Sequence, residues 1–141
     1  MMTRVDDNRL EDSQSKDLKS RVEMINESKA SLAVSVHQNS YTDESVKGAQ
    51  VFYYTQSMAG KRAAHIVQNA LKKVDSNNTR QEKSNAVYYM LKRTEVPVII
   101  MECGFLSNAE EEQKLITEEY QSQIASAAAD GIVEYLESYG G

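Results

Sequence analysis

Two segments of the sequence place a chemically capable side chain directly after a short apolar run. His37 follows residues 32–36, and Glu102 follows the four apolar residues 98–101. A histidine in such a position can be a metal ligand, a general base or a hydrogen-bonded loop residue. A carboxylate there costs desolvation unless it is paired in a salt bridge or takes part in chemistry. With a raised pKa, Glu102 would suit a general base that activates water.

Cys103 suggests a rival chemistry, in which its thiol and His37 form a nucleophilic pair. Consecutive side chains of a strand point to opposite faces of the sheet. If Glu102 faces the pocket of His37, Cys103 therefore faces the packed interior, where a free cysteine behaves as a small apolar residue. This argument disfavours the thiol mechanism. As the only cysteine, Cys103 also excludes an internal disulfide and a cysteine-based structural zinc site.

The remaining polar candidates are less specific. Arg80 is a lone cation in a polar segment after a helix end. A surface position is its ordinary interpretation, but an arginine aimed at the strand-end site could hold a substrate carboxylate. His65 lies on the polar stripe of a predicted helix, and we expect it to be solvated.

The pattern along the chain predicts strands that alternate with helices. Such an order favours a single α/β domain with a mostly parallel sheet and helices on both faces. Ligands bind beyond the carboxyl ends of the strands in these folds, which is where His37 and Glu102 fall. The predicted helices span residues 17–29, 59–74, a short stretch opened by a Ser107-x-x-Glu110 capping box, and 124–139; the predicted strands span residues 32–36, 48–54, 86–91 and 98–101.

Composition narrows the classes of partner. The 141 residues carry a net charge of −5, which disfavours general attraction to nucleic acid or to an acidic membrane surface. The charge says little about a mostly neutral glycan. The sequence contains no transmembrane run and no secretory leader.

Several motifs, in order along the chain, resemble the zinc-dependent N-acetylmuramoyl-L-alanine amidases of the amidase-3 type. Two of them contain the strand-end residues: Ser35-Val36-His37-Gln38-Asn39 resembles the family's S-[IV]-H-x-N, and Glu102-Cys103-Gly104-Phe105-Leu106-Ser107-Asn108 resembles E-x-G-F-[LI]-S-N. Four further segments are Met2-Thr3-Arg4, Arg21-x-x-x-x-Asn26, Gly48-Ala49-x-Val51-Phe52-Tyr53 and Tyr120-Gln121. The resemblance covers essentially the whole chain, and its finer features are most similar to the germination-specific, sporulation branch.

The resemblance implies a peptidoglycan hydrolase. On this resemblance, the enzyme would use zinc-activated water to cut the amide between N-acetylmuramic acid and the L-alanine of the stem peptide. His37 would be a zinc ligand and Glu102 the catalytic acid and base. Asn39 would support the zinc site and the substrate, and Arg80 would contact the stem peptide. The expected partners are the peptide and the glycan, without nucleic acid or membrane contact from this chain; an activator protein stays open.

The sequence departs from the family pattern at its beginning. Family members have a D-x-G-H-G segment and a following glutamate, which supply the other two protein ligands of Zn²⁺, and neither has a counterpart here. We therefore expect this chain to be the C-terminal portion of the catalytic domain, lacking the family's first strand and helix. The missing part would also hold an export signal, which places the parent protein outside the cytoplasmic membrane, in the cell wall or the forming spore.

Two other functions stay open on sequence grounds. A degenerate, metal-free peptidoglycan-binding module is favoured by the two absent ligands, whereas a carboxylate at position 102 favours the enzyme. A cytoplasmic cysteine hydrolase rests only on Cys103 and the lack of a leader.

Overall fold

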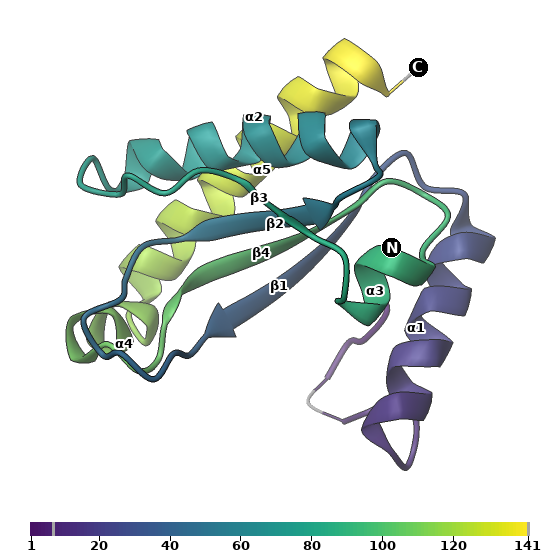
Figure 1. The fold of residues 1–141 in the computed structure, drawn as a ribbon, viewed down its shortest axis with the longest axis horizontal. Helices are drawn as coiled ribbons and strands as arrows, with labels where there is room; N and C mark the ends of the chain where they lie inside the picture. Colours follow the sequence, from purple (N-terminus) through teal and green to yellow (C-terminus); the bar gives the residue numbers. More distant parts are fainter. Residues whose placement is uncertain (7, 141) are drawn as a thin grey trace.

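A computed structural model describes residues 1–6 and 8–140, and it shows a central sheet covered by helices on both faces (Figure 1). The α/β class predicted from the sequence is confirmed. The elements in chain order are α1 (Gln14–Ser28), β1 (Ala33–Asn39), β2 (Gln50–Tyr54), α2 (Met58–Val74), β3 (Lys83–Asn85), α3 (Tyr89–Arg93), β4 (Val98–Phe105), α4 (Ala109–Leu115) and α5 (Glu118–Tyr139).

The sheet has four strands in the order β1-β4-β2-β3. β1 runs parallel to β4 and β2 runs parallel to β3, whereas β2 and β4 are antiparallel. The mostly parallel sheet that the sequence predicts is therefore present, with one antiparallel pairing at its centre. β4 is the fully buried strand, in keeping with its apolar run, and Pro97 stands just before it, where a missing N–H disturbs no ladder.

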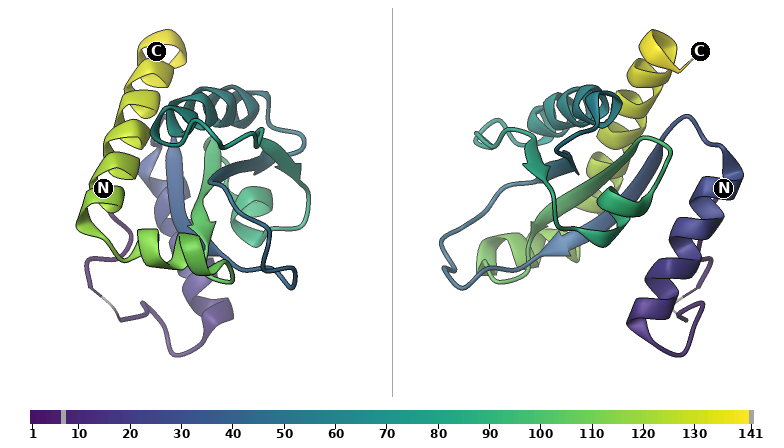
Figure 2. Two further views of the ribbon diagram at one scale, coloured as in Figure 1. Left: turned by 90° about the vertical axis from the view of Figure 1, so that its left-hand side faces the viewer. Right: turned by 45° about the vertical axis from the view of Figure 1, so that its right-hand side comes forward.

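One face of the sheet packs against α2 and α5, which lie side by side in both views of Figure 2. Val51, Ile99 and Met101 from the strands meet Val67 and Leu71 from α2 in the main core. The two helices approach closely at Gly131, where a Cβ atom would lie 3.0 Å from the Cα of Val67. A side chain at position 131 would therefore force the helices apart.

The opposite face is covered by α3, and α1 packs against α3 from outside (Figure 1). Phe52, Leu91 and Ile100 form one small cluster here, and Val22, Ile25 and Met90 form another. Asn26 ties α1 to the segment before β4, because its side chain accepts a hydrogen bond from the N–H of Glu95 at 2.8 Å. This face carries the chemistry described below. Among the described residues, no helix combines the length and apolar character needed to cross a membrane.

The structure corrects the prediction for residues 86–91. The β-branched and aromatic residues there favour a strand, but the strand is β3, just before them, and Tyr89–Arg93 form α3. The side chain of Asn85 accepts hydrogen bonds from the N–H groups of Val87 and Tyr88, which turns the chain out of the sheet. The buried neighbours Met90 and Leu91 then pack into two different clusters.

The predicted capping box at Ser107 is also wrong by one residue. Asn108 is the N-cap of α4, and its side chain accepts from the N–H of Glu111 at 3.1 Å. Ser107 instead accepts a hydrogen bond from the N–H of Tyr41 on its hydroxyl. Both residues are good N-caps, so the local sequence does not distinguish them, and the long-range contact to Tyr41 does.

Glu111 is a buried carboxylate that joins two loops at the end of the sheet. Its two oxygens accept hydrogen bonds from the N–H of Gly48 at 2.9 Å and from the N–H of Phe105 at 2.8 Å. Gly48 has a φ of 101°, a value that favours glycine. Glu111 therefore holds the loop that precedes β2 against the end of β4.

We expect Glu111→Ala to lower the free energy of unfolding by about 3 kcal/mol, because it leaves two buried N–H groups without an acceptor. Glu112→Ala is the matched control, since that neighbouring side chain is exposed on the same helix, and its effect should stay within about 0.5 kcal/mol. Chemical denaturation of both variants measures the difference. Equal effects of the two substitutions would refute this role of Glu111.

Candidate active site

His37 and Glu102 are direct neighbours across β1 and β4. They are register partners in the parallel pairing, so their side chains lie on the same face of the sheet. Both line one cavity of about 280 Å³, as predicted. Their predicted position one residue past the strands is wrong, because β1 continues to Asn39 and β4 to Phe105. The cavity is bounded by Gln14 and Leu18 of α1, by Tyr88, Tyr89 and Met90 around α3, and by Ile100 of β4.

Glu102 is buried and lacks part of its expected hydrogen bonding. Only 7% of the residue is exposed, and its Oε2 atom is buried without a hydrogen-bond partner in the described part of the chain. Burial raises the pKa of the Glu102 carboxyl group. A salt bridge to Glu102, the structural alternative for a buried carboxylate, is absent among residues 1–6 and 8–140. An unpaired buried carboxylate oxygen is available to accept a proton or bind a ligand.

His37 stands at the open rim of the same cavity. Its Nε2 atom lies 2.8 Å from the hydroxyl of Ser35, which orients the ring. Partial burial lowers the pKa of His37, and the positive charge of Arg21 on α1 adds to this effect. A neutral imidazole retains the lone pair that a metal ion requires. With Nε2 in contact with Ser35, Nδ1 is the ring nitrogen left for a ligand.

Cys103 is directed away from this cavity. It belongs to the core on the other face of the sheet, beside Met101 and Leu115. Burial raises the pKa of Cys103 to about 11, and the charge of Glu102 contributes to the shift. The thiol is thus protonated at neutral pH and lies on the wrong face for His37. A nucleophilic Cys103–His37 pair is incompatible with this arrangement.

Arg80 does not line the cavity, but it contacts residues of the two strands β2 and β4. Its guanidinium donates to Gln50 Oε1 at 3.0 Å and to the carbonyl oxygen of Lys47 at 2.6 Å. It also lies over the ring of Phe105, 4.7 Å from the centroid. Gln50 is the register partner of Glu102 in the β2–β4 pairing. Arg80 therefore contacts Gln50, the residue opposite Glu102 on β2. Its guanidinium is held by Lys47, Gln50 and Phe105.

Asn39 is separated from the cavity by an irregularity in β1. The register of β1 against β4 shifts between His37 and Asn39, so that Asn39 pairs with Phe105. Its side chain accepts a hydrogen bond from the N–H of Ser40, and it is not among the residues that line the cavity. The supporting role expected of Asn39 stays a prediction.

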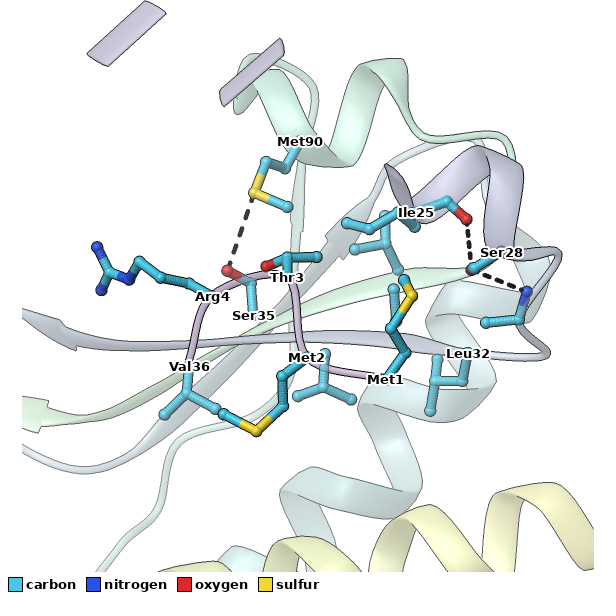
Figure 3. A pocket seen from close by; sticks show the side chains of 14 residues that line it. Met1, Met2, Thr3, Arg4, Ile25, Ser28, Leu32, Ser35, Val36 and Met90 are labelled. Carbon is cyan, nitrogen blue, oxygen red and sulfur yellow. Dashed lines mark hydrogen bonds between the residues drawn. The ribbon is translucent and has the colours of Figure 1, made fainter. Parts of the chain in front are cut away.

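A second cavity of about 620 Å³ lies at the outer edge of β1 (Figure 3). It is bounded by residues 1–4, by Ile25 and Ser28 of α1, and by Leu32, Ser35 and Val36 of the β1 segment. Figure 3 shows Ser35 directed toward Met90, whose sulfur is 3.9 Å from the hydroxyl. Met90 lines both cavities. β1 thus forms an edge of the described sheet, with His37 close to that edge.

The donors in the active-site cavity suit zinc in kind but not in number. An imidazole nitrogen and an unpaired carboxylate oxygen are typical of a catalytic zinc centre. Such centres use about three protein ligands, however, and among the described residues no group of three His, Cys, Asp or Glu side chains is arranged for a metal ion. His37 can therefore hold zinc only together with ligands that these residues do not provide.

No sequence signal marks the residues on the wall of the cavity. Tyr88 and Tyr89 belong to a segment that was expected to be a strand, and Gln14 and Leu18 come from the first turns of α1. Their proximity to Glu102 depends on how α1 and α3 pack over the sheet. Arg21 belongs to a sequence motif that does not indicate its position, yet it lies near enough to His37 to influence its pKa.

The fold and the cavity together define an α/β protein with an imidazole and an unpaired carboxylate side by side on a parallel strand pair. Comparison with known proteins gives the family. The model of the amidase-3 family, described as N-acetylmuramoyl-L-alanine amidase, matches residues 1–134. The chain belongs to this family.

Individual relatives agree with this assignment. The chain is 35% identical over 124 residues to the germination-specific N-acetylmuramoyl-L-alanine amidase of Bacillus subtilis, covering 88% of this chain and 52% of that protein. The CwlD amidase of Clostridioides difficile, solved in complex with the GerS lipoprotein, superposes with a TM-score of 0.91 at 36% identity, over 98% of this chain and 75% of that one. The catalytic domain of the CwlV amidase of Paenibacillus polymyxa gives a TM-score of 0.85 at 32% identity, over 97% of this chain and 72% of that one. The chain thus spans about half the length of the Bacillus germination-specific relative.

Proposed function

We propose that the protein carrying this chain hydrolyses the amide bond between N-acetylmuramic acid and the L-alanine of the peptidoglycan stem peptide. One observation carries the proposal: the unpaired Glu102 Oε2 atom is buried in the cavity that His37 also lines. Family membership supports the substrate class. Such a protein acts outside the cytoplasmic membrane, where peptidoglycan lies, and its similarity to a germination-specific amidase supports a role in spores.

In this proposal the two residues have different tasks. His37 is one ligand of a zinc ion, and Ser35 orients its ring. When bound, zinc polarises the carbonyl group and lowers the pKa of water. Glu102 accepts a proton from the attacking water and delivers it to the nitrogen of the leaving L-alanine. Its buried position keeps the carboxylate close to the reacting atoms and weakly solvated.

Arg80 is proposed to bind a carboxylate of the stem peptide. Its Nε and Nη1 atoms are held by Lys47 and Gln50, and the ring of Phe105 supports the guanidinium. In the described part of the chain, Nη2 has no hydrogen bond, so it can still donate to a ligand. An oriented arginine of this kind is well suited to a planar carboxylate.

A protein partner is a further part of the proposal. The CwlD amidase of Clostridioides difficile was solved in complex with the GerS lipoprotein. At 36% identity over nearly the whole of this chain, that complex supports a search for a partner of the protein described here.

The test is product analysis by mass spectrometry after incubation of the whole zinc-loaded protein with purified muropeptides. Amidase activity releases a peptide with a free N-terminal L-alanine and leaves N-acetylmuramic acid with a free lactyl carboxylate. Binding of muropeptides without either product would favour the second candidate, a metal-free peptidoglycan-binding module. That candidate is supported by the shortage of metal ligands among the described residues.

A further inference from the structure

Two tyrosines form one side of the active-site cavity without a role in the chemistry proposed above. Tyr88 and Tyr89 both line the cavity that holds His37 and Glu102. The exposed fractions of the two residues are 38% and 41%, so both are accessible to solvent beside the cavity. We call this pair the tyrosine rim.

Tyr88 of the tyrosine rim is held in place by its surroundings. The ring of Tyr88 meets the buried ring of Phe52 edge-on, with centroids 5.7 Å apart and planes at 63°. Asn85 accepts a hydrogen bond from the N–H of Tyr88 at 2.8 Å. An aromatic surface that is both exposed and fixed loses little conformational entropy when it binds a ligand.

The register of the sheet places the tyrosine rim and Arg80 on opposite sides of Glu102. Phe52 pairs with Ile100, which lies two residues before Glu102 along β4. The ring of Tyr88 packs against the ring of Phe52. Arg80 binds Gln50, the register partner of Glu102, and covers Phe105, three residues after Glu102. Along the direction of β4 the order is therefore tyrosine rim, Glu102, Arg80.

The two sides differ in chemistry. The tyrosine rim offers aromatic faces with hydroxyl groups and no charge, which suit the C–H face and the polar edges of a pyranose ring. Arg80 offers a positive charge, which suits a carboxylate. A substrate with an N-acetylated sugar on one side of its scissile amide and an acidic peptide on the other has the same asymmetry.

We propose that the tyrosine rim binds a sugar ring of the glycan, so that the substrate lies along β4 with its glycan on Tyr88 and Tyr89 and its stem peptide toward Arg80. This inference rests on the proposed amidase function. It adds the direction in which the substrate lies and the residues that contact its sugar.

The test uses two separate probes in NMR titrations of the whole protein. One is the peptide-free disaccharide of N-acetylglucosamine and N-acetylmuramic acid, and the other is a free stem peptide that begins with L-alanine. Tyr89→Ala should weaken disaccharide binding about tenfold, since an aromatic contact surface is lost. It should leave the affinity for the peptide unchanged. Tyr89→Phe, which keeps the ring, should bind the disaccharide nearly as well as the native protein.

Arg80→Gln should show the reverse pattern, with peptide binding reduced about tenfold and disaccharide binding retained. Tyr89 is exposed, so its substitution should not unfold the protein, and a thermal melt checks this. No saturable disaccharide binding, or a loss of peptide binding in Tyr89→Ala, would overturn the proposed direction. Both probes lack the scissile amide, so their binding is independent of turnover. A protein that binds both as described but releases no product would refute the amidase proposal alone.

Discussion

Replacing Glu102 by glutamine is expected to lower amidase turnover about a thousandfold, the range that general acid–base catalysis contributes. The amide has nearly the same shape as the carboxylate, but it cannot accept a proton from water and pass it to the leaving nitrogen. The bound zinc should stay at the native level, because Glu102 is proposed to act on the proton and His37 to hold the metal. Turnover of muropeptides and zinc content, measured on the same preparations, give the two readouts.

Glu82→Gln is the matched control for this substitution. Glu82 also carries a buried oxygen without a hydrogen-bond partner among the described residues, but it pairs with the exposed His65 and does not line the active-site cavity. Its substitution should leave turnover within about twofold of the native value, as expected for a change remote from the site. If Glu102→Gln removed the zinc and kept residual turnover, the roles assigned to Glu102 and His37 would be reversed.

Replacing His37 by alanine is expected to remove most of the bound zinc, leaving less than about a tenth of the native content, because each imidazole ligand contributes a large part of the binding free energy. Turnover should fall with the metal. Adding excess zinc should restore the metal content only in part. Metal analysis by mass spectrometry after dialysis gives the stoichiometry directly.

The control is His65→Ala, which removes the only other histidine of the chain. His65 lies on α2, with its ring toward Glu82 and Asn69, and takes no part in the cavity of Glu102. Its substitution should leave the zinc content unchanged. Full zinc occupancy in His37→Ala, or loss of zinc in His65→Ala, would show that the metal is held elsewhere.

The pairing of His37 with Glu102 could be predicted because it follows from a general property of parallel strands. Each residue comes directly after an apolar run, and parallel strands bring corresponding positions side by side, although β1 and β4 continue beyond them. The alternation of side chains then separates Cys103 from Glu102. These arguments need only the position of each residue along its own strand.

The surroundings of the pair depend on contacts that are distant in sequence. The shift in register after His37, which separates Asn39 from the cavity, has no signal in the local sequence. Arg80 lies between α2 and β3 and is oriented by Phe105, the last residue of β4. Tyr88 and Tyr89 have the composition of a strand, whereas the side chain of Asn85 turns them out of the sheet. Long-range contacts thus decide the positions of Asn39 and Arg80, whereas a local turn at Asn85 decides those of Tyr88 and Tyr89.

The central claim, that the cavity shared by His37 and Glu102 is a zinc-dependent hydrolytic site, is tested most directly by diffraction from crystals of the whole zinc-loaded protein. Anomalous scattering at the zinc absorption edge locates the ion independently of any assumed chemistry. We predict one strong peak about 2.1 Å from a ring nitrogen of His37, the usual zinc–nitrogen distance, on the side of the ring that faces the Glu102 carboxylate. A fully occupied zinc ion bound away from His37, or none in a protein that releases the L-alanine peptide, would contradict the claim.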